Sequence, residues 1–187
     1  MMTKIPYIVF TGSHSCGKTS SITSLIPHLK RMYDYPIYHI TEVSRKLNKE
    51  LGVSINKEGT NITQKLIEST YKKEEDLHDK EVRIADRSII DRFAYMITSK
   101  AAEDFSLIQW YKDNIKSTCD KYSHIFYLPV VDEIKLSLDG VRSSDEEYRK
   151  EIDKIIKETI KNYNIKVYTL VGNIEQRVNQ IIEVLND

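Results

Sequence analysis

The sequence has little cysteine, no long apolar run and no excess of charge of either sign. Its 187 residues include two cysteines, Cys16 and Cys119. They are too few and too far apart for a secreted disulfide framework or a zinc site. No apolar stretch approaches the ~18 residues of a transmembrane helix, and no apolar segment near the N-terminus resembles a signal peptide. These absences argue against secreted and membrane proteins, and we expect a cytoplasmic one.

The charges cancel, with 28 lysines and arginines against 28 aspartates and glutamates. This balance argues against a protein held on nucleic acid or on an anionic membrane by bulk charge, although a local basic pocket is compatible with it. Hydrophobic residues make up 40% and charged residues 30%, an ordinary composition for a globular protein. At ~150 residues per domain, we expect residues 1–187 to form one domain.

Short apolar segments alternate with helical patterns along the chain. The strand candidates are residues 5–11, 37–41, 82–85, 123–128 and 165–171. Helical patterns cover residues 17–33 and about 88–100, and others begin near residues 104, 144 and 173. Two of these helices open with capping-box spacing, Ser88 with Asp91 and Asn173 with Gln176. The alternation predicts an α/β fold with a parallel sheet that helices cover on both faces.

Three further features carry local expectations. Pro27 lies inside the first helical pattern and should kink the helix or end it early. Residues 48–61 are polar, contain two glycines and suggest a mobile loop between helices. Residues 72–81 are densely charged, which is typical of a solvated helix face.

Residues 12–19 read GSHSCGKT and match the phosphate-binding loop pattern G-x-x-x-x-G-K-[ST]. The motif follows the first strand directly and opens an amphipathic helix, the context that phosphate binding requires. Gly12 and Gly17 permit backbone conformations that point successive N–H groups inward. Lys18 would bridge the terminal phosphates, and Thr19 would hold Mg²⁺ through its hydroxyl. The predicted nucleotide-binding residues are Gly12, Ser13, His14, Ser15, Cys16, Gly17, Lys18, Thr19 and Ser20.

The third strand runs into Asp86 and Arg87, at the edge of the sheet where open α/β folds bind ligands. Asp86 is a second candidate ligand for Mg²⁺, and Arg87 can pair with phosphate oxygens. A helix cap or an ion pair between the two is the alternative. The chain lacks the N-K-x-D pattern of a GTPase switch, and about 16 residues after the last strand are few for the lid domain of an AAA+ motor.

Residues 81–95 (EVRIADRSIIDRFAY) resemble P-loop nucleoside and nucleotide kinases. The similarity extends to the deoxynucleoside and thymidylate kinases, and more strongly to the AAA-domain family that includes nicotinamide riboside kinase. An E-x-x-R pattern at Glu42 and Arg45 and a D-G-x-R-S pattern at residues 139–143 also match this group. The four motifs occur in the order that the family has. The resemblance implies an α/β fold of three layers, with a five-stranded parallel sheet in the order 2-3-1-4-5 and helices on both faces.

This resemblance implies roles for further residues. Glu42 follows the second strand and is the candidate base or ligand for the acceptor hydroxyl, while Arg45 and Arg87 would bind the acceptor. Arg142 would belong to a lid of about residues 137–150 that closes on the transferring phosphoryl group. Asn173 would lie beside the adenine, although its capping-box position explains it equally well.

The sequence therefore predicts an ATP- and Mg²⁺-dependent kinase with Lys18, Glu42, Asp86, Arg87 and Arg142 as catalytic residues. The acceptor is left open between a nucleoside, a nucleoside monophosphate and nicotinamide riboside. A modified base in DNA is a weaker alternative because the net charge is zero. A regulatory ATPase or GTPase without kinase activity is the rival from another class. We expect no membrane partner, and the resemblance leaves a homodimer open.

Overall fold

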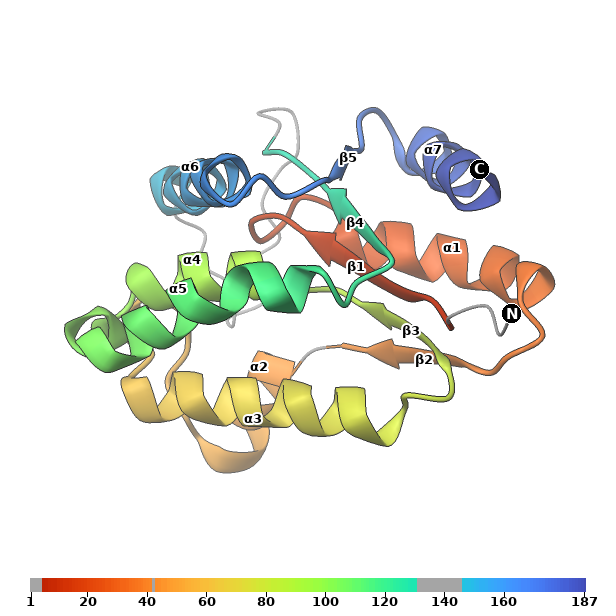
Figure 1. Cartoon of the computed structure of the whole chain (residues 1–187). Helices are drawn as coiled ribbons and strands as arrows, with labels where there is room; N and C mark the ends of the chain where they lie inside the picture. Colours follow the sequence, from red (N-terminus) through yellow and green to blue (C-terminus); the bar gives the residue numbers. More distant parts are fainter. Residues whose placement is uncertain (1–4, 42, 131–145) are drawn as a thin grey trace.

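Five parallel strands form a sheet in the order β2-β3-β1-β4-β5 (Figure 1), which confirms the predicted order. The computed structural model describes residues 5–41, 43–130 and 146–187. The strands are β1 (Tyr7–Thr11), β2 (Ile37–Ile40), β3 (Val82–Ala85), β4 (His124–Tyr127) and β5 (Tyr168–Thr169). Since all of them run the same way, their carboxyl ends lie along one edge of the sheet.

Alternate residues of the central strand β1 pack into two separate cores. Ile8 and Phe10 belong to a core formed with α1 (Lys18–Met32) and α7 (Ile174–Asn186). Tyr7 and Val9 belong to a larger core on the opposite face. The helices of that second layer are α2 (Val43–Leu51), α3 (Asn61–Leu77), α4 (Ile89–Ile97), α5 (Phe105–Cys119) and α6 (Glu146–Asn162). The predicted three-layer architecture is therefore confirmed.

Side-chain caps begin several of these helices where the sequence predicts them. Ser88 and Asp91 form a complete capping box at the start of α4, and Asn173 and Gln176 form another at the start of α7. Asp104 accepts a hydrogen bond from the backbone N–H of Leu107 and caps α5. These caps satisfy backbone donors that the first helical turn leaves unpaired.

Two local predictions need correction, and one of the two alternatives for Pro27 is excluded. Pro27 does not end α1, which continues to Met32; Pro27 is exposed, so water can solvate the backbone carbonyl that its missing N–H leaves unpaired. Residues 48–61 are not one loop, because they contain the end of α2 and the 3-10 helix η1 (Asn56–Glu58). The last strand is shorter than residues 165–171. Residues 146–150 form the start of α6, as the helical pattern near residue 144 predicts, and the lid of about residues 137–150 stays a prediction.

The densely charged residues 72–77 lie in α3, in agreement with the predicted solvated helix face. α3 extends to Leu77, where Lys72, Lys73 and Asp76 are exposed. A second 3-10 helix, η2 (Lys100–Glu103), connects α4 to α5. Within the described part of the chain, no helix combines the length and the apolar character needed to cross a bilayer.

Candidate active site

The loop between β1 and α1 has the backbone conformation of a phosphate cradle. Gly12 has φ of +152° and Gly17 has φ of +90°, both in a region that side chains with a Cβ rarely adopt. A Cβ on Gly12 would lie 2.5 Å from the carbonyl oxygen of Leu128, on the strand extension beside it. The two glycines are therefore required by backbone geometry and, at Gly12, also by a close approach.

Lys18 is buried at the mouth of this loop. Its Nζ donates to the carbonyl oxygens of Gly12 at 2.7 Å and Ser13 at 2.6 Å, and it lies 3.6 Å from Cys16 Sγ. An ammonium group is a compact point charge on a flexible stem, suited to following terminal phosphate oxygens. The lysine predicted to contact the phosphates is thus held by the loop itself.

The end of β3 faces the loop and carries the predicted acidic and basic pair. Asp86 is buried, and its Oδ2 accepts from the Thr41 hydroxyl at 3.2 Å, beyond the end of β2. Arg87 lies over the ring of Tyr95, with 4.4 Å between the guanidinium carbon and the ring centroid. Its Nη1 is 3.5 Å from Oδ2 of Asp91, so Arg87 forms its ion pair with Asp91 and not with Asp86, the partner in the alternative interpretation.

Asp91 anchors α4 beneath this pair. Its Oδ1 accepts from the backbone N–H of Ser88 at 2.6 Å, from the Ser88 hydroxyl at 3.0 Å and from the Thr11 hydroxyl at 3.2 Å. Burial raises the pKa of the Asp91 carboxyl, while Arg87, Lys18 and the bonds from Ser88 act in the opposite direction. Asp91 therefore ties the end of β1 to the start of α4, the helix that follows Arg87.

A buried cluster closes the cavity on the side of α3. Arg92 Nε donates to Oε1 of Glu68 at 2.7 Å, and its guanidinium carbon lies 4.2 Å from the ring centroid of Tyr71. The Tyr111 hydroxyl donates to the same Glu68 oxygen at 2.6 Å. The sequence did not decide whether Arg92 is a surface residue, and the structure places it in the wall of the cavity.

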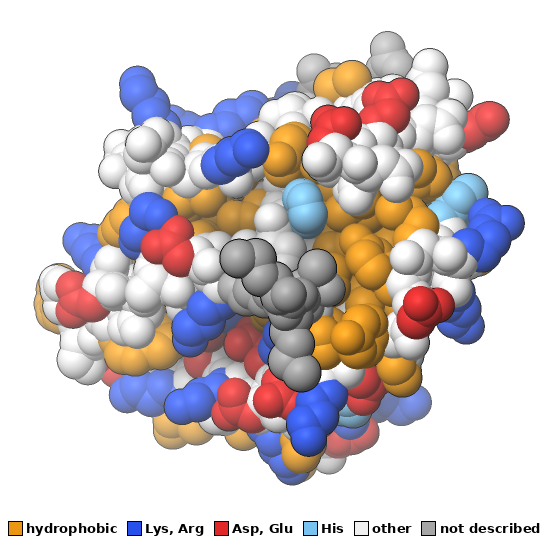
Figure 2. All heavy atoms as spheres, turned by 45° about the vertical axis from the view of Figure 1, so that its right-hand side comes forward, with side chains coloured by type: hydrophobic (Ala, Val, Ile, Leu, Met, Phe, Trp, Pro, Cys, Tyr) orange, Lys and Arg blue, Asp and Glu red, His pale blue; other side chains and the backbone are white. Residues whose placement is uncertain are grey.

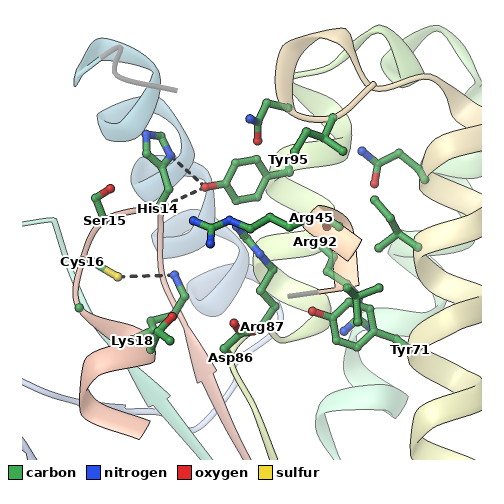
Figure 3. Close-up of a pocket in the computed structure, with 18 of the residues that line it drawn as sticks. His14, Ser15, Cys16, Lys18, Arg45, Tyr71, Asp86, Arg87, Arg92 and Tyr95 are labelled. Carbon is green, nitrogen blue, oxygen red and sulfur yellow. Dashed lines mark hydrogen bonds between the residues drawn. The ribbon is translucent and has the colours of Figure 1, made fainter. Parts of the chain in front are cut away.

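These groups surround one cavity of about 150 Å³ (Figure 3). Most of the predicted site residues that the structure describes line it: His14, Ser15, Cys16, Gly17, Lys18, Thr19, Ser20, Arg45, Asp86 and Arg87. Gly12 and Ser13 lie behind the cavity wall and hold Lys18 through their carbonyl oxygens. Asn173 is exposed, caps α7 and does not line this cavity. Glu42 and Arg142 lie outside the described residues, and their roles stay predictions.

For several residues of the site, the sequence predicts no role. Tyr71 and Tyr95 line the cavity, and both were among twelve tyrosines that are mostly expected in packing. Arg177 of α7 donates from Nη1 to the carbonyl oxygen of Cys16 at 2.9 Å. No pattern in the sequence marks Arg177, because its partner is 161 positions away.

The donor atoms of the cavity fit a nucleotide with Mg²⁺. Thr19 and Asp86 place a hydroxyl and a carboxylate on the same cavity, and Mg²⁺ prefers one or two such oxygen ligands together with phosphate oxygens. Among the described residues, no group of three or more histidine, cysteine or acidic side chains could hold a metal by itself. The hydroxyl of Thr19 and the carboxylate of Asp86 suit a cation that takes its other ligands from a phosphate group.

A family model described as an AAA domain matches residues 7–177. The chain belongs to this AAA-domain family. The match includes the phosphate-binding loop, the end of β3 and Arg177. A search of curated proteins finds no match.

Solved structures of P-loop nucleoside and nucleotide kinases share the fold of this AAA domain. Thymidylate kinase from Ehrlichia chaffeensis has 16% identity and a TM-score of 0.65, with 99% of this chain and 100% of that chain covered. Deoxyadenosine kinase from M. mycoides with products bound has 16% identity and a TM-score of 0.62, with 96% and 98% covered. NadR protein in complex with NR has 16% identity and a TM-score of 0.71. The match covers 98% of this AAA domain but 52% of the NadR chain, so the domain spans about half of that protein.

Proposed function

We propose that this chain is an ATP- and Mg²⁺-dependent phosphotransferase that moves the γ-phosphate of ATP to a nucleoside or a nucleoside monophosphate. One observation carries the proposal: Lys18 of the phosphate-binding loop lines the same cavity as Arg45 of α2 and the two residues after β3, Asp86 and Arg87. Donor and acceptor groups would meet between these elements. The fold shared with deoxyadenosine kinase and thymidylate kinase supports the same activity.

Each part of the cavity then has a chemical task. The loop and Lys18 would hold the triphosphate, and Thr19 and Asp86 would supply oxygen ligands to Mg²⁺. Mg²⁺ bound there offsets the charge of the phosphate oxygens. Arg87 and Arg45 would neutralise charge on the transferring group and the acceptor. Burial acts to lower the pKa of Arg87, but Tyr95, Asp91, Tyr71 and Asp86 together raise that pKa above its usual value, so Arg87 stays charged.

Glu42 and Arg142 complete the proposed mechanism. Glu42 would orient the acceptor hydroxyl or take its proton, and Arg142 would reach the phosphoryl group from the lid. Asn173 would lie near the adenine. We propose that residues 1–187 act as one kinase domain.

A small acceptor suits the cavity better than DNA does. Basic and acidic side chains are intermixed on the face drawn in Figure 2, and they do not gather into a basic tract there. DNA binding depends on such tracts, because phosphate contacts provide most of its affinity. The apolar and aromatic part of the cavity wall, with Val43, Ile67 and Tyr71, is suited to a flat base.

The test is a screen of acceptors with labelled ATP and Mg²⁺. Nucleosides, nucleoside monophosphates, nicotinamide riboside and DNA with a modified base are incubated with the protein, and products are identified by mass. We expect a small-molecule product heavier by one phosphate, which the Lys18→Ala variant fails to form. Tight ATP binding without any phosphorylated product would favour a regulatory nucleotide-binding protein instead.

A further inference from the structure

The hydroxyl of Tyr95 joins α4 to the phosphate-binding loop. It accepts a hydrogen bond from the backbone N–H of His14 at 2.9 Å and lies 3.0 Å from His14 Nδ1. The direction of the hydrogen bond between the hydroxyl and this imidazole nitrogen follows the tautomer of His14. Tyr95 therefore binds both the main chain and the side chain of one loop residue.

The ring of the same tyrosine supports Arg87. The guanidinium lies over the ring face at 4.4 Å, a cation–π contact, while Asp91 holds its Nη1 from below. Figure 3 shows the Tyr95 hydroxyl directed at His14 of the loop, with the arginines of the cavity beside the Tyr95 ring. The Tyr95 side chain thus contacts both the loop that would hold ATP and Arg87, which would neutralise charge on the transferred phosphate.

A second tyrosine restrains the ring. Tyr148 of α6 meets Tyr95 edge to face, with 6.2 Å between the ring centroids. Tyr95 is 7% exposed, so its ring has little room to turn. The contacts with the loop and with Arg87 consequently come from a side chain of fixed orientation.

We propose that Tyr95 is a positioning residue for phosphoryl transfer, which sets the phosphate-binding loop and Arg87 at a fixed separation. The inference rests on the proposed function, because that function supplies the phosphoryl transfer. The contacts themselves are independent of it: the hydroxyl of Tyr95 contacts the loop, and its ring contacts Arg87. The hydroxyl and the ring therefore have separable effects. Loss of the hydroxyl removes both of its contacts with His14 and loosens the loop, whereas loss of the ring removes the cation–π contact with Arg87.

Two substitutions separate these effects. Tyr95→Phe keeps the ring, and we expect it to raise both KM for ATP and Kd for a non-hydrolysable ATP analogue by about tenfold, with kcat nearly unchanged. Tyr95→Leu removes the ring as well, and we expect kcat to fall by a further tenfold or so because Asp91 alone then holds Arg87. Unchanged ATP affinity in Tyr95→Phe would overturn the inference.

Tyr122→Phe is the matched control. The Tyr122 side chain is also 7% exposed, and its hydroxyl accepts the backbone N–H of Ile89 at 3.3 Å, at the start of the same helix. We expect a similar loss of melting temperature and unchanged ATP affinity, and an equal loss of affinity would reduce Tyr95 to a general stabilising role. If the unaltered protein binds the analogue but transfers no phosphate, the proposed function fails and the affinities still decide the role of Tyr95.

Discussion

Arg177 donates a hydrogen bond from Nη1 to the carbonyl oxygen of Cys16 at 2.9 Å and so joins the C-terminal helix to the phosphate-binding loop. Arg177 is buried, and a Cβ on the neighbouring Gly17 would lie 2.7 Å from the same Nη1. The second glycine of the loop motif therefore leaves room for this arginine. With Tyr95 bound at His14, the loop is held from two helices that lie on opposite faces of the sheet.

Replacing Arg177 is expected to weaken nucleotide binding. Arg177→Met keeps the apolar stem but removes a charged hydrogen bond worth about 1.5–3 kcal/mol, so we expect the affinity for an ATP analogue to fall by about tenfold or more. Titration calorimetry measures this directly. The control is Gln176→Ala, which removes the capping box of α7. It should lower the melting temperature and leave the affinity unchanged, and equal effects of both variants would contradict the anchoring role.

Gly12 should tolerate no side chain. Gly12→Ala combines a positive φ with an approach of 2.5 Å to a backbone oxygen, and we expect it to cost about 3 kcal/mol or more of the free energy of unfolding. Gly52→Ala is the comparison, because Gly52 also has a positive φ of +66° but no atom within 4 Å of an added Cβ. It should cost about 1 kcal/mol. Chemical denaturation distinguishes the two, and similar losses would show that conformation alone matters at Gly12.

The buried ion pair of Glu68 with Arg92 should be far more sensitive than an exposed one. Glu68→Ala leaves the guanidinium of Arg92 buried without its carboxylate, and we expect a loss of about 3–5 kcal/mol in stability. Glu58 pairs with Lys100 where both side chains are more than half exposed. Glu58→Ala should cost less than about 1 kcal/mol. Comparable denaturation midpoints for the two variants would contradict this account of the cavity wall.

His124 of β4 should make stability depend on pH. Burial lowers the pKa of His124 below its usual 6.5, and Lys166 lowers it further. The unfolded chain then binds more protons than the folded one between the two pKa values, so this contribution is fully present above about pH 6.5 and is lost as the pH falls. We expect His124→Phe to gain melting temperature relative to the unaltered protein as the pH drops from about 8 to about 5.5. A difference in melting temperature that stays constant across that pH range would contradict the lowered pKa of His124.

Features encoded by near neighbours in the sequence were predictable. The loop motif at residues 12–19, the capping boxes at Ser88 and Asn173, and the alternation of strands and helices depend on residues a few positions apart. Each one satisfies backbone hydrogen bonds or buries an apolar face locally, which is why spacing alone reveals it. The strand order followed from the resemblance of four such motifs to one kinase group, and the structure confirms it.

Tertiary packing decided what local patterns misjudged or could not reach. Pro27 is tolerated inside α1 because its position on the helix is exposed, and the length of β5 depends on pairing with β4 rather than on its own apolar run. The bonds of Tyr95 to His14 and of Arg177 to Cys16 span 81 and 161 positions. Such contacts exist because the sheet brings distant segments to one edge, and no propensity or spacing within either segment carries that information.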